Sequence, residues 1–348
     1  MDKTKLKDFA DKIYGDMAGA MAVGMADVGT RTGLFHAMKG QGDLTAPQLA
    51  EKTGLQLRYI EEWLAGMAAA GYVDYAPETE TFCLPDEHAY LLASEGTDHF
   101  VGGLFRFAPV LLAATGPVAQ AFRTGGGVAF SDNAPDLIEA LEMINAGTYR
   151  QRLTEYWLAQ LPEAVDRLNA GGRVLDVGCG AGQVPMLLAE AFHAAEVVGL
   201  DPDAASIDRA KAQRSDAARP TFVQATTADY RPESGFDLIT LCDVLHDLPD
   251  PLTTLREIRG LLNGGGTLFI LEPKAADTLA DNLNPMGAMF YGFSLFHCMT
   301  QSLASGGPGL GTCMGPTRIH ATLKEAGFSQ TETLEIRSAT NLFFAARA

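Results

Sequence analysis

The sequence predicts an α/β protein in which a doubly wound, seven-stranded sheet follows a smaller, mainly helical part. Three observations lead to this fold class. Apolar strands alternate with amphipathic helices after residue 171, two more strands follow each other at the end of the chain without a helix between them, and helix, turn, helix and hairpin patterns succeed one another before residue 95. The length of 348 residues also suits two domains, since single cores rarely grow beyond about 250–300 residues.

The N-terminal part has the element order of a winged helix. Thr45 is a suitable N-cap for a first helix, with Pro47 just inside it and Gly54 at its end. A second helix follows from residue 56, and the stretch GYVDYAPETETFCLP at 71–85 predicts a two-stranded wing. The apolar positions at helical spacing in the second helix are Leu57, Ile60, Leu64, Met67 and Ala68.

Winged helices often bind DNA, so this function has to be weighed for residues 1–95. The second helix carries Arg58 but also Glu61 and Glu62, and 8 Lys and Arg face 15 Asp and Glu in the whole segment. DNA binding needs a basic face. The composition therefore favours a packing and dimerisation module over a DNA reader.

The bulk composition limits the classes of partner, metal site and cellular location that the protein can have. A net charge of −17 disfavours nucleic acid and anionic membranes as partners, and 47% apolar residues favour a large core. The five cysteines are scattered without a CxxC pair, which predicts reduced thiols and no metal site. No secretory signal or run of 18 apolar residues is visible, so we expect a cytoplasmic protein without membrane spans.

From residue 171 the pattern is that of a parallel sheet covered by helices on both faces. Residues 96–170 form an expected helical connector and lid before it. The expected strands are 173–178, 196–201, 221–226, 236–243 and 267–273, followed by 330–338 and 340–348 as an antiparallel pair at the sheet edge. The expected helices between the parallel strands are 181–192, 203–214 and 251–262.

Small and acidic residues end successive strands of this sheet. The stretch VLDVGCGAGQ at 174–183 places three glycines where a strand becomes a helix, so a ligand can lie against the backbone and the helix N-terminus. Asp201 closes the second strand, where an acid binds a ribose diol, and Asp229 closes the third, where it could accept a hydrogen bond from an exocyclic amine. Each acid alone could be a helix cap, but three in succession predict a nucleotide site.

The spacing of the first motif indicates which nucleotide is bound. Dinucleotide folds usually carry GxGxxG, whereas this stretch has DxGxGxG. Asp176 would repel a pyrophosphate but could orient the ammonium group of an amino acid. A nucleoside joined to a zwitterion is therefore expected, which S-adenosylmethionine fits better than NAD.

On these motifs the sequence resembles the class I S-adenosylmethionine-dependent methyltransferases, with VLDVGCGAGQ, GLDPD, ADY and FDLITLCDVLHDLPDP matching successive motifs over 171–348. The N-terminal winged helix is similar to that of small-molecule O-methyltransferases, in which it forms a homodimer and helps to wall the substrate pocket. The resemblance implies a Rossmann-like fold with domains at 1–95, 96–170 and 171–348. The cofactor-binding residues that it implies are Asp176, Gly178, Cys179, Gly180, Gly182, Gln183, Asp201, Pro202, Ala228, Asp229, Tyr230, Cys242 and Asp243.

The stretch CDVLHDLPDP, after the fourth strand, suggests the catalytic groups. Its His246–Asp247 pair resembles the LHDW motif of plant-type O-methyltransferases, in which the His removes a proton from the acceptor hydroxyl. Glu272, at the end of the fifth strand, would fix the tautomer of that imidazole. The sequence departs from the motif at Leu248, where the family has Trp. The alternative is that His246 only packs against the cofactor.

The long aromatic and glycine-rich segment 281–312 predicts a cap over the methyl acceptor. The candidate substrate residues are Asn282, Tyr291 and His297 in this segment and Tyr149 upstream. A hydroxyl acceptor is the leading expectation, and a thioether or thiol acid is the alternative. Two other classes stay open at this point, namely a winged-helix regulator with a ligand-sensing domain and an NAD-dependent oxidoreductase.

Overall fold

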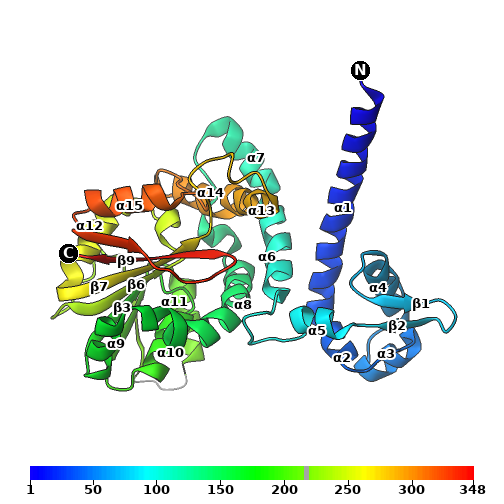
Figure 1. Cartoon of the computed structure of the whole chain (residues 1–348), viewed down its shortest axis with the longest axis horizontal. Coiled ribbons are helices and arrows are strands. Elements are labelled where there is room, and N and C mark those ends of the chain that lie inside the picture. Colours follow the sequence, from blue (N-terminus) through cyan, green and yellow to red (C-terminus); the bar gives the residue numbers. More distant parts are fainter. Residues whose placement is uncertain (215–218) are drawn as a thin grey trace. The chain divides into compact units, whose positions relative to one another are not determined.

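The computed structural model describes residues 1–214 and 219–348 (Figure 1). It contains two compact units, one made of residues 1–110 with 140–148 and the other of residues 111–139 with 149–348. The domain boundaries expected after residues 95 and 170 stay predictions.

The first unit contains the expected helix, turn, helix and hairpin in the expected order. Its elements are α1 (Lys3–Thr32), α2 (Leu34–Met38), α3 (Ala46–Thr53), α4 (Leu57–Ala69), β1 (Asp74–Ala76), β2 (Thr81–Cys83), α5 (Asp86–Leu92) and most of α6 (Gly102–Ala113). Strands β1 and β2 pair antiparallel as the wing. A winged helix is therefore present, as the sequence predicts.

Local sequence explains the ends of α3 and the packing of α4. The Thr45 hydroxyl accepts from the backbone N–H of Gln48 in a capping box, and Gly54 ends α3 with a φ of 70°. Of the apolar positions at helical spacing, Ile60, Leu64 and Met67 are buried, whereas Leu57 at the start of α4 is 40% exposed. Trp63 is also buried, and its indole N–H donates to the carbonyl of Met25 on α1 at 2.8 Å.

Helix α1 carries an apolar stripe on its exposed side. Side chains three to four residues apart share one face of a helix, and the exposed apolar positions follow this spacing. They are Leu6, Phe9, Ile13, Met17, Met21 and Val28. The opposite face of the C-terminal half packs into the unit through Ala22, Ala26 and Gly29.

The second unit is built on a seven-stranded sheet in the order β5-β4-β3-β6-β7-β9-β8. Only β9 runs antiparallel to its neighbours, pairing with both β7 and β8, as the closely spaced last strands predict. The strands are β3 (Arg173–Val177), β4 (Glu196–Asp201), β5 (Thr221–Gln224), β6 (Phe236–Cys242), β7 (Leu262–Pro273), β8 (Gln330–Thr333) and β9 (Asn341–Arg347).

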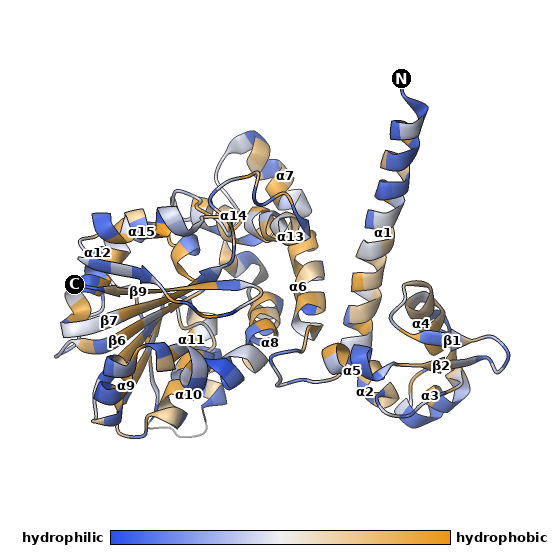
Figure 2. Ribbon diagram, viewed as in Figure 1, coloured by the Kyte–Doolittle hydropathy of each residue, from blue (hydrophilic) through white to orange (hydrophobic). Residues whose placement is uncertain are grey.

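Helices cover both faces of this sheet because neighbouring strand residues point to opposite sides. On one face Leu175 packs with α12 (Pro251–Leu261) and α15 (Pro316–Glu325). On the other face Val174 packs with α9 (Pro162–Asn169) and α10 (Gln183–Ala191). Both faces of the strands are apolar, since each packs in its own hydrophobic cluster, and much of the sheet is coloured hydrophobic in Figure 2. Helix α11 (Ala204–Gln213) packs beside β4 and β5.

The rest of the second unit lies before the sheet and between β7 and α15. Before the sheet come α7 (Thr115–Thr124), η1 (Phe130–Asn133), the ends of α8 (Ala134–Arg152), η2 (Leu153–Trp157) and η3 (Leu158–Gln160). Between β7 and α15 lie α13 (Pro285–Phe293), the π-helical turn η5 (Ser294–Cys298) and α14 (Met299–Ala304). Among the described helices none is long and apolar enough to cross a membrane by itself, and only the bent pair of α6 and α7 reaches that length and composition together.

Candidate active site

The glycine motif forms the turn from β3 into α10. Gly178, Gly180 and Gly182 all have a positive φ, which side-chain-bearing residues rarely adopt. A Cβ on Gly178 would lie 2.6 Å from Val244, and a Cβ on Gly182 would lie 2.5 Å from Phe222. A Cβ on Gly180 would meet no atom of the described residues within 4 Å. The outer glycines therefore serve packing, whereas Gly180 faces open space where a ligand could lie against the backbone.

Two of the predicted acids lie directly at this turn. The carboxylate of Asp201 accepts from the backbone N–H of Gly180 at 2.9 Å and from that of Asp203 at 2.8 Å. Asp176 is buried in β3 and accepts from the hydroxyl of Thr240 on β6 at 2.5 Å. Burial raises the pKa of Asp176 to about 7, against the opposing effect of the Thr240 hydrogen bond. This carboxylate would be stabilised by a cationic ligand.

Most of the other predicted cofactor residues lie on the same edge of the sheet, but the ring of Tyr230 lies against Phe236, the first residue of β6, toward the opposite edge. Cys179 is buried in the glycine turn, Gln183 begins α10 and Pro202 follows β4. Asp229 is exposed in the loop after β5, where it accepts from the hydroxyl of Thr226 at 2.8 Å. Ala228 is exposed beside it, and the Tyr230 ring stacks on Phe236 with centroids 6.3 Å apart.

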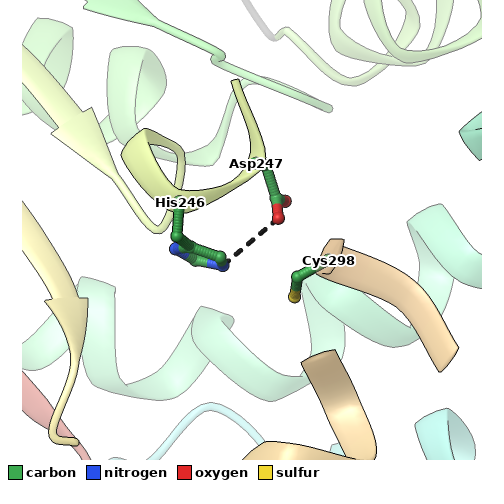
Figure 3. A group of neighbouring side chains, drawn as sticks. All are labelled: His246, Asp247 and Cys298. Carbon is green, nitrogen blue, oxygen red and sulfur yellow. Dashed lines mark ion pairs between the residues drawn. The ribbon is translucent and has the colours of Figure 1, made fainter. Parts of the chain in front are cut away.

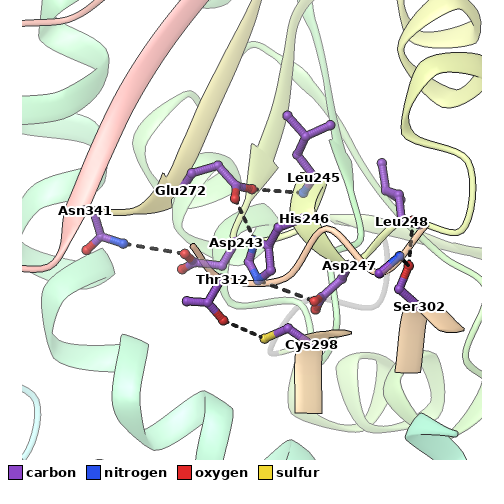
Figure 4. A network of polar contacts seen from close by, with 11 residues as sticks. Asp243, Leu245, His246, Asp247, Leu248, Glu272, Cys298, Ser302, Thr312 and Asn341 are labelled. Carbon is purple, nitrogen blue, oxygen red and sulfur yellow. Dashed lines mark hydrogen bonds and ion pairs between the residues drawn. The ribbon is translucent and has the colours of Figure 1, made fainter. Parts of the chain in front are cut away.

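Asp243 stands in a strained conformation at the end of β6, directly after Cys242. Its φ of 58° is unusual for a residue other than glycine, and such strain is concentrated at functional sites. The hydroxyl of Tyr149 donates to Asp243 Oδ2 at 3.1 Å. The amide of Asn341 donates to Oδ1 at 3.5 Å, as Figure 4 shows. Burial and the neighbouring Glu272 raise the pKa of Asp243 to about 7.

His246 lies between two carboxylates in the short turn η4 (Leu245–Asp247). Its Nδ1 is 2.6 Å from Glu272 Oε2 on β7, and its Nε2 is 3.3 Å from Asp247 Oδ1. The other oxygen of Glu272 accepts from the backbone N–H of Leu245 at 2.9 Å. Burial alone would lower the pKa of His246, but Glu272 and Asp247 together hold it well above its ordinary value.

The segment 281–312 lies against this turn and adds Cys298 to the site. The Sγ of Cys298, the Nε2 of His246 and a carboxylate oxygen of Asp247 lie within 4.8 Å of one another (Figure 3). The hydroxyl of Thr312 donates to Cys298 Sγ at 3.3 Å. Ser302 donates to the carbonyl of Leu248 at 3.2 Å, which fixes α14 to the residues after η4. This segment therefore contributes directly to the environment of His246.

The predicted acceptor residues do not all point to one place. His297 is buried on η5, where burial lowers its pKa, and it interacts electrostatically with Asp247 and His246. Tyr149 reaches Asp243, as described above. Asn282 bonds the backbone of Ala276 through both ends of its amide at 2.9 Å, so it holds its own loop. Tyr291 on α13 is 40% exposed.

Cys298, Thr312, Thr240 and Asn341 belong to the site but were missed by sequence reasoning. Cys298 and Thr312 lie 52 and 66 residues after His246, and no motif connects them to it. Asn341 opens β9, where the sequence indicates only a strand. Thr240 had a detectable signal, since it is the polar residue inside the apolar strand LITLC and a buried hydroxyl needs a partner.

Comparison with protein families matches both units. The family described as "Methyltransferase domain" matches residues 149–332, and the "Rv2258c-like winged HTH domain" matches residues 19–94. Among curated proteins, a trans-aconitate 2-methyltransferase of Methylobacterium radiotolerans is 38% identical over 132 residues, which cover 38% of this chain and 46% of that protein. The match thus spans about half the length of this relative.

Solved structures share the whole architecture at low sequence identity. A candidate O-methyltransferase from Nostoc punctiforme PCC 73102 matches with a TM-score of 0.71 and 18% identity over 99% of each chain. Human N-acetylserotonin methyltransferase, solved with SAM, matches with a TM-score of 0.69 and 16% identity over 97% of each chain. These likenesses show a common fold with the α/β sheet and the N-terminal winged helix.

Proposed function

Because the chain belongs to the S-adenosylmethionine-dependent methyltransferases, whose domain matches more than half of it, we propose that it methylates a hydroxyl group of a small molecule with His246 as the proton acceptor. The observation that carries this proposal is the buried pair of His246 and Glu272, 2.6 Å apart at the end of β6 and β7. A carboxylate on one ring nitrogen fixes the tautomer and stabilises the imidazolium that forms when the other nitrogen takes a proton.

The residues at the carboxyl ends of β3 and β4 fit the cofactor that this family uses. The open space at Gly180 would admit the ligand to the backbone, and buried Asp176 would pair with the ammonium group of its amino-acid part. Asp201 would hold the ribose hydroxyls, and Asp229 is placed in the next loop for the adenine. When bound, the cofactor supplies an electrophilic methyl group on a sulfonium.

The residues around His246 would then position and deprotonate the acceptor. In its neutral form, His246 would accept the hydroxyl proton at Nε2, and the bound cofactor would supply the methyl group to the acceptor oxygen. The buried surroundings of η4 and η5 exclude water from this step. Tyr149 and Asn341 would hold Asp243 beside the reacting groups through the hydrogen bonds described above.

A sulfur acceptor is the alternative, and the carboxylates around the site favour it. Asp243, Asp247 and Glu272 surround His246, and negative charge would stabilise a sulfonium product. A thioether carries no proton, so its methylation needs no base. His246→Ala would then spare most activity on a thioether while abolishing activity on a hydroxyl.

We further propose that the protein acts as a cytoplasmic homodimer whose subunits associate through α1. The exposed stripe that includes Phe9, Ile13 and Met17 is too apolar for a surface that stays in water along its whole length. Light scattering after size-exclusion chromatography measures the mass directly. A dimer that becomes monomeric in Phe9→Asp/Ile13→Asp supports the proposal, and a monomeric wild type overturns it.

A metabolite screen tests the reaction itself. The purified protein is incubated with S-adenosylmethionine and pools of small phenols, hydroxy acids, thiols and thioethers, and S-adenosylhomocysteine release is measured. Calorimetry with S-adenosylhomocysteine alone provides the acceptor-independent control. Protein that binds neither compound would contradict the proposal, whatever the screen contains.

A further inference from the structure

Three side chains of different chemistry converge beside the proposed proton acceptor. His246 and Asp247 come from η4, and Cys298 comes from η5, where the π-helical turn places it at the end of the bulge. Figure 3 shows the three side chains close together, with the ion pair between His246 and Asp247 marked. Their nitrogen, oxygen and sulfur atoms lie within 4.8 Å of one another, and each residue offers one ligand atom to a metal ion.

The separation of the nitrogen and oxygen atoms suits a tetrahedral ion. Ligand nitrogen and oxygen atoms about 2.0–2.1 Å from a shared Zn²⁺ lie roughly 3.3–3.4 Å apart at tetrahedral angles. His246 Nε2 and Asp247 Oδ1 are 3.3 Å apart. Asp247 Oδ1 is buried and makes no hydrogen bond within the described part of the chain, so this oxygen is available to a ligand.

The residues behind the ligands have the arrangement of an outer coordination shell. Metal-binding histidines usually donate their other ring N–H to a carboxylate, and His246 meets Glu272 in this way at 2.6 Å. The Thr312 hydroxyl donates to Cys298 Sγ at 3.3 Å, which would stabilise a thiolate. Figure 4 shows both contacts.

The charges around the cluster also favour a cation. Asp247, Glu272 and Asp243 all lie close enough to His246 to influence its charge. Burial of such a negative group of side chains is costly unless a positive charge compensates it. A protonated His246 supplies part of this positive charge, and one divalent ion with a thiolate and a carboxylate among its ligands would replace it once the imidazole releases its proton.

We infer that His246, Asp247 and Cys298 form a binding site for a borderline divalent cation of the Zn²⁺ class, and that an ion there blocks the proton transfer to His246. The nitrogen–oxygen–sulfur ligand set is one that zinc accepts and magnesium or calcium does not favour. The lone pair of His246 Nε2 cannot hold an ion and accept a proton at once. The blocking part of this inference rests on the proposed function, whereas the binding site does not.

Binding is measured on the full-length protein without any methyl acceptor. Co²⁺ is titrated into metal-free protein, and the thiolate-to-cobalt charge-transfer band is followed, with Zn²⁺ displacing it afterwards. We expect about one ion per chain, and at least about 100-fold weaker binding in Cys298→Ser and in Asp247→Asn, because losing even an outer-shell partner costs about 10–100-fold. Cys83→Ser, in the wing of the first unit, is the matched control and should bind like the wild type.

The outcome of the titration decides whether the site exists. Absence of the sulfur-to-cobalt band, or equal binding by the wild type and Cys298→Ser, overturns it. Unfolding curves of both cysteine variants are recorded alongside. If Cys298→Ser does not fold, Glu272→Gln is the second variant, and wild-type-like cobalt affinity in Glu272→Gln would overturn the proposed coordination.

Activity then separates the two proposals. With an acceptor from the screen, stoichiometric Zn²⁺ should inhibit methyl transfer and a chelator should restore it. Zinc that binds at Cys298 but leaves turnover unchanged or raises it would overturn the role of His246 as proton acceptor and leave the cation site intact. Zinc that inhibits wild type and Cys298→Ser equally would overturn the cation site as the cause.

Discussion

The candidate site has a proposed cofactor side, at the carboxyl ends of β3 to β5, and a proposed acceptor side around His246, and the two are built in different ways. On the cofactor side, the groups come from loops that directly follow β3, β4 and β5, and the key feature is the backbone at Gly180. On the acceptor side, His246 and Glu272 end β6 and β7, but Cys298 and His297 come from the separate segment between β7 and α15. The first side is determined by local sequence, whereas the second depends on tertiary packing.

This difference determines which substitutions each side tolerates. A loop that folds by local rules loses its shape when a glycine is replaced, but it depends little on distant residues. The acceptor side depends on contacts between segments, such as the hydrogen bond from Ser302 to Leu248. Five predictions can break or sharpen this contrast, from the largest expected effect to the smallest.

The largest effect is expected on the acceptor side. Removing a general base typically lowers the rate about 10²–10⁴-fold, so His246→Ala should lower kcat by this amount on a hydroxyl acceptor and leave S-adenosylhomocysteine binding within about threefold. Turnover and calorimetry measure the two quantities. The control is His320→Ala on α15, whose ring contacts Thr331 and Thr333. A small loss of kcat in His246→Ala would assign this histidine a packing role.

On the cofactor side, Gly180→Ala should weaken S-adenosylhomocysteine binding about 10–100-fold, since a Cβ would occupy the open space at the turn and overpacking costs about 1–3 kcal/mol. Gly54 is the matched control, because it also has a positive φ, of 70°, and free space around it, but it ends α3 in the first unit. Both variants should lose similar stability, about 1–2 kcal/mol. Equal cofactor affinity in the two variants would contradict the placement.

A change of pH is expected to alter the affinity for S-adenosylhomocysteine about tenfold. The pKa of Asp176 is raised to about 7 by burial, with Asp201 adding to the rise, and only the carboxylate form pairs with an ammonium group. S-adenosylhomocysteine affinity should therefore increase about tenfold from pH 6 to pH 8, as calorimetry at several pH values would show. Asp176→Asn should bind weakly and without this slope, and an unchanged slope in that variant would assign it to another group.

The same carboxyl group also makes the free energy of unfolding depend on pH, but this contribution falls as pH rises, whereas the cofactor affinity increases. Its pKa in the folded protein, about 7, lies above the ordinary value of 3.8, so the folded state holds the extra proton between these values. This contribution to the free energy of unfolding is greatest at low pH and is lost as pH rises toward 7. Denaturant unfolding of Asp176→Asn should therefore depend less on pH than that of the wild type.

The smallest effect is expected for DNA. The first unit has the fold of a winged helix, but residues 1–95 carry 15 acidic and 8 basic residues. Gel-shift assays at physiological salt should show no complex with the purified protein. A complex whose affinity falls steeply with rising salt would instead support a DNA-binding regulator. The two sides of the candidate site would then serve ligand sensing and not catalysis.

The sequence predicts most of the fold because its strands and helices follow local rules. The expected bounds of β4 agree with the structure, and Thr45 and Gly54 cap α3 as capping chemistry requires. The burial along α4 depends on tertiary contacts. Helical spacing alone does not tell which face meets α1, and Leu57 is 40% exposed whereas Trp63 is buried and donates to Met25.

The residues of the candidate site also divide into those that local sequence predicts and those whose positions depend on tertiary packing. Asp176, Gly180 and Asp201 belong to contiguous motifs, so their proximity follows from the parallel sheet. Cys298 could not be predicted as a neighbour of His246, because its direction depends on the π-helical turn at Ser294–Cys298 and on the packing of that segment. Asn282 shows the converse, since a polar residue in the predicted cap turned out to bond its own loop.

The attachment of segment 281–312 to the loop of His246 uses main-chain atoms of that loop. The N–H of Gly311 donates to the carbonyl of His246 at 3.3 Å, and Ser302 donates to the carbonyl of Leu248. Carbonyl groups persist through any substitution at those positions. Selection or engineering could thus exchange the side chains of 281–312 other than Ser302 for those that recognise another acceptor, and the anchoring geometry would be kept.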